Sequence, residues 1–370
     1  MKKIVIAGIL LSAAAPGARA QSSVTLYGII SDGIGYVSNE GGHRFIGAIQ
    51  NHIQPSRFGF RGQEDLGDGV SAVFTLENGF GPLDGTLSNG GRLFGRQAYV
   101  GLSSRTMGTA TLGRQYDNIV DFLKPYESAA LFGAISAHIG DNDNVFDAFR
   151  ENNTIKYVTP VYRGFQAGAM YGASNKAGDF SDNRSYSAGA SWAGGGVSVG
   201  AAYLHLNRPG DATNTSGSVS LDYTGPFKTS VVNPAAGVDV QENFGIGASY
   251  TVNVIQISAL VTRSNFRYLD HTSLHLNNYE ASIIYNLSAS WQFGAGYAFT
   301  DGKYGATGTQ PKWHQGVVGI DYFLSKRTDL DLVSIYQRAA GDATTTNIFS
   351  LPASTSKSQL YVGLGIRHKF

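Results

Sequence analysis

Side chains along much of this chain alternate between large apolar residues and small or polar ones, with a period of two. The clearest example runs from Ser290 to Phe299. One set of positions is apolar and the other is small or wettable: Trp291, Phe293, Ala295, Tyr297 and Phe299 against Ser290, Gln292, Gly294, Gly296 and Ala298. Because successive side chains of a β-strand point to opposite faces, this segment is expected to be a strand with one lipid-like face.

The same period recurs along the whole chain. Residues 165–171 repeat it, two arginines alternate with two phenylalanines in 57–61, and residues 360–370 end the chain with the same alternation. A soluble β-sandwich also alternates, but its outer face tends to be charged, whereas the second face here is often Gly, Ala or Ser. The pattern as a whole therefore favours the wall of a membrane barrel.

The connections between these segments alternate between short turns and long polar loops. Short turns are expected at 64–69, 104–108, 194–196 and 325–327, and long segments near 39–52, 80–94, 117–152, 207–242, 301–311 and 341–356. This asymmetry is typical of outer-membrane barrels. An even number of antiparallel strands closes a barrel without a free edge, and roughly 16 leave a water-filled lumen. The predicted fold is all-β, a 16-stranded antiparallel transmembrane β-barrel, with strands near 23–37, 55–64, 70–79, 95–103, 108–116, 153–160, 165–173, 185–193, 197–206, 243–251, 254–267, 275–287, 289–300, 312–324, 328–340 and 357–370.

The first 20 residues are typical of a secretory signal. Lys2 and Lys3 precede an apolar run from Ile4 to Ala15, and the segment ends in Ala18-Arg19-Ala20, a small-x-small cleavage site. We therefore expect two parts, a signal peptide at 1–20 and a barrel domain at 21–370, with cleavage after Ala20. No later run of about 18 apolar residues predicts a transmembrane helix.

Composition agrees with this interpretation and excludes other classes. The chain has 48 Gly, 20 Tyr and 20 Phe, charged residues make up only 15%, and the formal net charge is +1. A near-neutral chain is not expected to bind nucleic acid. The chain has no Cys, which excludes disulfides and thiolate metal sites.

Several short motifs resemble a known family. They are Gln21–Gly28, Ser56–Gly62, Gly67–Phe74, Gly95–Leu102, Gly113–Asp117, Asn152–Tyr157 and Arg367–Phe370, and they follow one another over essentially the whole mature chain. The chain resembles the general trimeric porins of Gram-negative bacteria, in particular the β-proteobacterial and neisserial-type branch. The resemblance implies a homotrimeric, 16-stranded pore in the outer membrane, with its third loop folded into the lumen.

Candidate pore residues are the charges expected to face the lumen. Arg57 and Arg61 alternate with Phe58 and Phe60, and the resemblance implies that the positions of Arg57, Arg96 and Lys156 form a basic ladder at the constriction. Glu77 alternates away from Phe74 and Leu76 and is expected to point inward. The other candidate acids lie in the 117–152 loop: Asp117, Asp121, Glu127, Asp141 and Asp143.

Four further residues are implicated by the resemblance. It implies that Arg114 holds the second loop of a neighbouring subunit through Asp84. It also implies that the terminal strand, with His368 and Phe370, is the signal read by the outer-membrane assembly machinery. Outer-membrane lipid and lipopolysaccharide are the other expected partners.

No catalytic constellation stands out, so neither an enzyme nor a cofactor is expected. His271 and His275 lie four residues apart in a loop, and Asp141–Asn144 looks like half of a calcium loop without its terminal acid, so no metal is assigned. The predicted function is passive diffusion of ions and small hydrophilic solutes. Because four wall cations face one wall acid and a mobile loop, a weak anion preference is expected. A substrate-preferring porin is the alternative, and a barrel enzyme or adhesin is a distant one.

Overall fold

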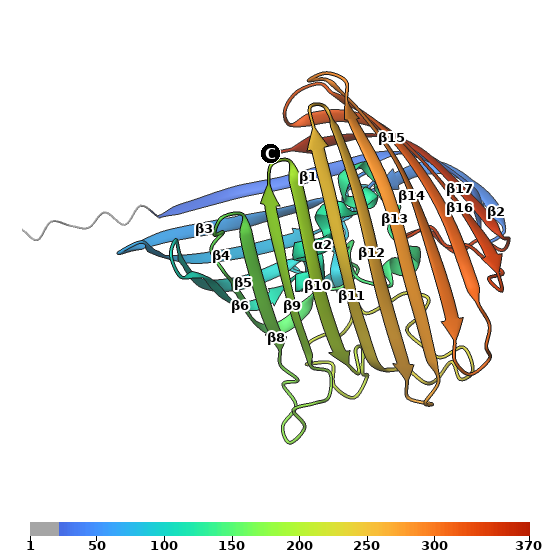
Figure 1. Cartoon of the computed structure of the whole chain (residues 1–370), viewed down its shortest axis with the longest axis horizontal. Coiled ribbons are helices and arrows are strands. Elements are labelled where there is room, and N and C mark those ends of the chain that lie inside the picture. The colour runs from blue at the N-terminus through green and yellow to red at the C-terminus, as the bar shows by residue number, and fades with distance from the viewer. Residues whose placement is uncertain (1–21) are drawn as a thin grey trace, which may run out of the picture.

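The structure, a computed structural model, describes residues 22–370, so the predicted signal at 1–20 lies outside the described residues. These residues form one antiparallel sheet that closes on itself where β1 pairs with β17 (Figure 1). The strands are β1 Ser23–Glu40, β2 His43–Gln50, β3 Arg57–Gly67, β4 Val70–Gly79, β5 Gln97–Ser104, β6 Gly108–Gln115, β7 Glu151–Val158, β8 Phe165–Gly172, β9 Ser185–Gly194, β10 Val197–Asn207, β11 Val238–Val252, β12 Ile255–Tyr268, β13 Ser273–Asn286, β14 Trp291–Tyr304, β15 Pro311–Phe323, β16 Thr328–Gly341 and β17 Ser358–Lys369.

The 17 strands fill 16 positions around the barrel, because β2 and β3 share one. β2 pairs with residues 32–40 of β1, and β3 pairs with residues 23–29 of the same strand. The predicted 16-stranded antiparallel barrel is confirmed. The expected long loop at 39–52 is wrong, because β2 occupies most of it after a turn at Gly41 and Gly42, which both have positive φ. Both faces of β2 carry apolar or small residues, so its period of two is hidden in the sequence.

Residues 51–56, between β2 and β3, interrupt this shared position and turn into the lumen. His52 is buried there, with Nε2 2.6 Å from Asp331 Oδ1 and Nδ1 2.5 Å from the Tyr361 hydroxyl. Ile53 joins an apolar cluster with residues of β15–β17. The interruption therefore narrows the lumen beside Arg57, which opens β3.

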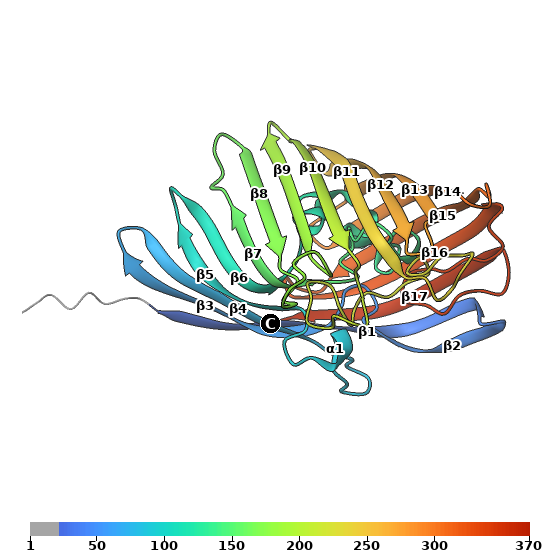
Figure 2. The same ribbon diagram turned by 90° about the horizontal axis from the view of Figure 1, so that it is seen from below.

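The connection between β6 and β7, residues 116–150, is the third loop. It contains α2 Asn118–Leu123, η1 Lys124–Tyr126, η2 Ala129–Gly133 and η3 Ile139–Asp141, and the strands enclose these segments (Figure 2). α1 Ser88–Gly91 lies between β4 and β5. Among the described residues, none of the helices has the length and apolar character needed to cross a bilayer.

The third loop packs on the inward-facing side chains of β9–β16. Ile119, Phe122, Leu123 and Tyr126 cluster with apolar residues of β10 and β12, and Phe132 clusters with apolar residues of β13, β15 and β16. The loop thus fills one side of the barrel. Cavities remain between the loop and Arg57 of β3, Gly79 of β4 and Arg96 before β5.

Glycines on the inner face allow this close approach. A Cβ at Gly294 would lie 2.3 Å from Phe132 Cγ, and a Cβ at Gly200 would lie 2.3 Å from the Phe122 carbonyl oxygen. At these two positions, the absence of a side chain on the inner face leaves the space that the third loop occupies.

Replacing Gly294 with Val should displace Phe132 and the loop segment around it. Overpacking of this kind costs about 1–3 kcal/mol, so we expect a lower thermal unfolding temperature together with an altered single-channel conductance. Gly316→Val is the matched control, because a Cβ at Gly316 meets nothing within 4 Å. Equal behaviour of the two variants would show that Phe132 does not rest on Gly294.

Candidate functional site

The wall side of the candidate site is built by β1, β4 and Arg96, the residue preceding β5. Arg96 Nε donates to Glu77 Oε1 at 2.9 Å, and the Tyr27 hydroxyl donates to Glu77 Oε2 at 3.0 Å. Arg96 Nη2 also donates to the Tyr116 hydroxyl at 2.6 Å. Glu77 is thus held between a cation and a phenol.

Arg96 reaches this place against the alternation of β5. Its strand neighbours with the same parity, Ala98 and Val100, lie on the outer face with the exposed Leu102. β5 begins only at Gln97, so Arg96 belongs to the irregular stretch before the strand and can turn its guanidinium inward. The two-residue alternation of the sequence alone would have placed Arg96 on the lipid side.

The opposite side of the constriction is the end of the third loop. Asp147 forms ion pairs with Lys124 and Arg150. Although burial favours its neutral form, the positive charges of Arg150, Lys124 and Arg96 hold the pKa of the Asp147 carboxyl below its ordinary value. Asp147 therefore stays ionised and faces the wall cations.

Two cavities meet at Arg96 and Asp147. One, of about 310 Å³, lies between residues 50–56, α1 and the end of the third loop, and includes Arg150. The other, of about 40 Å³, is lined by five charged side chains: Arg57, Arg96, Lys124, Arg367 and Asp147. Ile53, Pro55 and Phe146 line both cavities. The passage between them is the candidate pore constriction.

Two of the four predicted wall cations, Arg57 and Arg96, line this passage. Lys156 instead forms an ion pair with Asp121 and donates to the Tyr116 carbonyl oxygen at 2.8 Å. Arg61 is exposed and lies over the Tyr27 ring, 5.0 Å from its centroid. These two lie outside both cavities but next to residues that contact Arg96 or Glu77.

The predicted loop acids divide into three groups. Asp121 faces a wall cation, as described. Asp117 caps α2 through the Ile119 and Val120 amides, and Asp141 accepts from the Phe146 and Ala148 amides. Glu127 and Asp143 are buried around His138. Asp117, Glu127, Asp141 and Asp143 line neither of the two cavities, and the carboxylates of Asp117 and Asp141 accept hydrogen bonds from the loop backbone instead.

Arg114 is buried within its own subunit. It forms an ion pair with Asp222 and donates from Nε to the Gly95 carbonyl oxygen at 2.8 Å. Asp222 belongs to the fifth loop, residues 208–237, and also lies 3.5 Å from Arg92. Asp84 is exposed in the second loop and accepts from Thr86. Arg114 therefore joins the fifth loop to the second and third loops.

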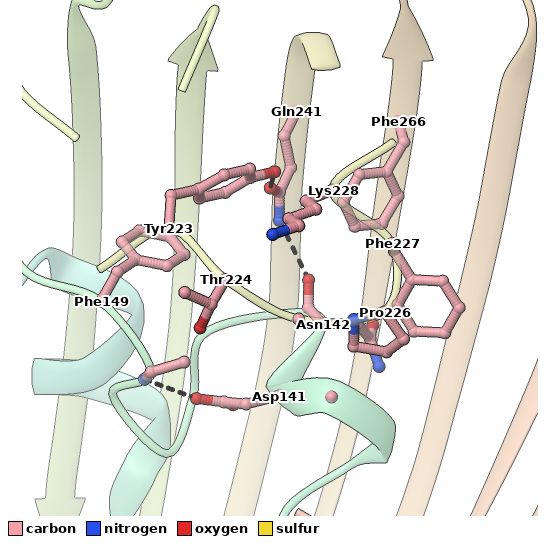
Figure 3. A pocket seen from close by; sticks show the side chains of 13 residues that line it. Asp141, Asn142, Phe149, Tyr223, Thr224, Pro226, Phe227, Lys228, Gln241 and Phe266 are labelled. Atoms are coloured by element: carbon pink, nitrogen blue, oxygen red, sulfur yellow. Dashed lines mark hydrogen bonds between the residues drawn. The ribbon is translucent and has the colours of Figure 1, made fainter. Parts of the chain in front are cut away.

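The fifth loop also covers the tip of the third loop. Figure 3 shows Tyr223, Thr224, Pro226 and Phe227 lying over Asp141 and Asn142, with Gln241 of β11 donating to the Asn142 carbonyl oxygen at 3.0 Å. The crevice between the two loops has a volume of only about 20 Å³. It can hold little more than one water, so it is a packed contact between loops and not a ligand site.

The terminal strand lies at the seam of the barrel. Phe370 exchanges two backbone hydrogen bonds with Gly28, at 3.0 and 3.1 Å, and its ring lies where a Cβ of Gly28 would be. His368 Nδ1 lies 2.8 Å from Thr328 Oγ1.

Sequence reasoning did not single out Tyr27, Tyr116, Asp147, Arg150 or Lys124 as pore residues. Tyr27 lies in a motif shared with the family, and its even spacing from Thr25 and Ile29 was a usable signal. The loop residues gave none, because an irregular segment has no period from which a face can be read.

Comparison with known proteins settles the family. A family model described as Gram-negative porin matches residues 7–344, most of the chain. The chain belongs to the Gram-negative porin family. Among its relatives, an outer membrane porin protein of Bordetella pertussis is 30% identical, and the outer membrane porin protein 32 of Delftia acidovorans is 31% identical, each alignment covering 100% of both chains. The solved structure of an anion-selective porin from Comamonas acidovorans has 26% identity and a TM-score of 0.75, covering 95% of this chain and 100% of that one.

This porin is therefore a multi-pass barrel of the outer membrane of a Gram-negative bacterium. It forms a channel for passive diffusion and is not an enzyme.

Proposed function

We propose that this porin is a general diffusion pore with a weak preference for anions, set at the passage between Arg57, Arg96 and Asp147. The supporting observation is the charge that lines the smaller cavity, four cations against one carboxylate. The larger cavity is lined by one further cation, Arg150. A low-dielectric channel lined by an excess of one sign raises the local concentration of counter-ions, here anions.

Arg57 contributes most to this excess. Arg96, Lys124 and Arg367 each have an acidic partner, in Glu77, Asp147 and Asp321. Within residues 22–370, the Arg57 guanidinium has no ion pair and no side-chain hydrogen bond. Its charge is therefore available to permeating ions. The anion selectivity named for the Comamonas acidovorans structure supports the same direction for this chain.

Liposome swelling tests the general pore against the substrate-preferring alternative. Vesicles containing the purified porin should swell at rates that fall smoothly with the size of neutral sugars, because no run of stacked aromatic rings lines the two cavities among the described residues. Rates that rank by sugar chemistry at equal size would favour a substrate-preferring porin, and no swelling would leave an adhesin or barrel enzyme. Empty vesicles are the control.

We also propose a homotrimer that associates through the outer face of β1–β5. Its side chains are exposed and apolar, among them Leu26, Ile34, Val100 and Leu102. A structure related to this fold is described as a trimer form. Unheated protein should run on gels at the mass of three chains and shift to one chain after boiling. Light scattering of the detergent-solubilised protein at the mass of a single chain would contradict the trimer.

Lipid and lipopolysaccharide are the proposed lateral partners. Cations lie on the outer face of the loop-side half of β12–β16, above the exposed Tyr279 and Tyr297: Arg263, Arg267, Lys303, Lys312 and Arg338. They suit the phosphates of an outer leaflet, with aromatics at the interface below them. Release of the signal at 1–20 and recognition of the terminal strand by the assembly machinery complete the proposal.

A further inference from the structure

Three side chains distant in sequence meet beneath the third loop. Glu127 follows η1, His138 precedes η3, and Glu280 comes from the inner face of β13. His138 Nε2 lies 2.9 Å from Glu280 Oε2, and one nitrogen or oxygen atom of each residue lies within 4.8 Å of the others. Their exposed fractions are 0%, 1% and 5%. The cluster is therefore sealed from bulk water.

One carboxylate in this cluster lacks hydrogen-bond partners. Neither oxygen of Glu127 forms a hydrogen bond or an ion pair within the described chain, whereas His138 Nε2 and Glu280 Oε2 lie 2.9 Å apart as an ion pair. Buried polar atoms are rarely left without a partner, and a buried carboxylate least of all. A buried carboxylate left unpaired beside this ion pair indicates that a ligand satisfies it.

The cluster also carries more negative than positive charge. Three buried carboxylates, those of Glu127, Asp143 and Glu280, surround the single imidazole of His138. Lys124, the cation nearest in sequence, is paired with Asp147. A bound divalent cation would balance this charge.

His138 is oriented as a metal-binding histidine is. Asp143 Oδ2 lies 2.7 Å from its Nδ1, and Asp143 is itself held by the Thr262 hydroxyl and by Asn278 Nδ2 at 3.2 Å. A carboxylate on one ring nitrogen fixes the tautomer that presents the other nitrogen as a lone pair, here toward the two glutamates. The Ser128 amide donates to Glu280 Oε1, which leaves Oε2 for the cluster.

We propose that Glu127, His138 and Glu280 bind one divalent transition-metal ion that fastens the third loop to β13. One imidazole and two carboxylates, with a water as the fourth ligand, would suit Zn²⁺, whereas Ca²⁺ and Mg²⁺ need more oxygen ligands. Ligand atoms around a tetrahedral Zn²⁺ lie about 3.3 Å apart, so Glu127 moves inward slightly. Binding releases the proton that His138 Nε2 carries when it pairs with Glu280.

The site has a consequence for the pore. Ala129 to Phe132, which begin two residues after Glu127, line the smaller cavity with Arg57 and Arg96. A metal that holds Glu127 and His138 therefore holds one wall of the constriction. This role is independent of the ion preference proposed above.

Metal binding is tested on the purified, folded porin after extraction with EDTA. Equilibrium dialysis against Zn²⁺ should give one ion per chain. His138→Gln and Glu280→Gln should abolish the stoichiometric binding, and Asp143→Asn should weaken it by about 10- to 100-fold. His52→Gln is the matched control, because His52 is equally buried against Asp331 but has no third ligand, and it should bind Zn²⁺ as the unmodified protein does.

A second measurement needs no variant and so does not depend on how each variant folds. The unmodified porin loaded with Co²⁺ should show the visible absorption of a four-coordinate site, and added Zn²⁺ should bleach it. Absence of stoichiometric Zn²⁺ and of this absorption would overturn the proposal. So would unchanged binding by folded His138→Gln. Either result would mean that Glu127 is simply protonated and that the cluster is a structural contact.

Discussion

Replacing Arg57 and Arg96 together with alanine should move the zero-current potential in a salt gradient toward cation selectivity. The smaller cavity would keep two cations, both paired, and Glu77 would lose its cationic partner. Two unit charges about 8 Å apart interact by about 2 kcal/mol at an effective dielectric of about 20, before screening by salt. We therefore expect the anion-to-cation permeability ratio to fall at least about threefold at low salt, and the sugar-size limit to widen.

Three variants separate charge from shape in this experiment. Arg57→Lys with Arg96→Lys keeps both charges and should keep the potential, although the planar forks are lost. Arg61→Ala removes a cation outside both cavities and should change the potential little. Glu77→Gln should shift it toward anions. All shifts should shrink at high salt, because the screening length falls. A double alanine variant with the parental potential at low salt would show that this passage does not set ion preference.

Deleting Phe370 should prevent accumulation of folded porin in the outer membrane. The residue supplies the last pair of backbone hydrogen bonds between the terminal strand and β1, where the barrel closes, and its ring packs against Gly28. Unpaired backbone groups at a seam in lipid cost several kcal/mol each. Fractionation with an unheated gel should show the deletion variant unfolded in the periplasm, while Phe370→Tyr assembles normally.

Refolding in detergent distinguishes the two contributions of Phe370. If the deletion variant refolds in vitro but fails in the cell, the residue acts chiefly as a signal for the assembly machinery. If it fails in both, closure of the seam is the main contribution. Normal insertion of the deletion variant in the cell would refute both roles.

The barrel itself was predictable from sequence, because the outward and inward faces of each strand are encoded by neighbouring residues. Strand faces repeat every two residues, so the alternation from Trp291 to Phe299 shows one outward and one inward face without any knowledge of its neighbours. The inward direction of Glu77 follows from the same rule, and the even number of strand positions follows from closing an antiparallel sheet without a free edge. The rule missed β2, since Phe45 and Ile49 on one face and Ile46 on the other are all apolar. It also misplaces Arg96, which lies one residue outside the regular strand.

What lies inside the barrel was decided only by the tertiary structure. The path of the third loop depends on side chains far away in sequence, such as the seat of Phe132 on Gly294, and an irregular segment has no period that reveals them. The same contacts decide which acids line the pore. Asp147 lines the passage, whereas the carboxylates of Asp117 and Asp141 accept hydrogen bonds from amides of the loop backbone. Local patterns thus determined the wall of this porin, and long-range packing determined its constriction.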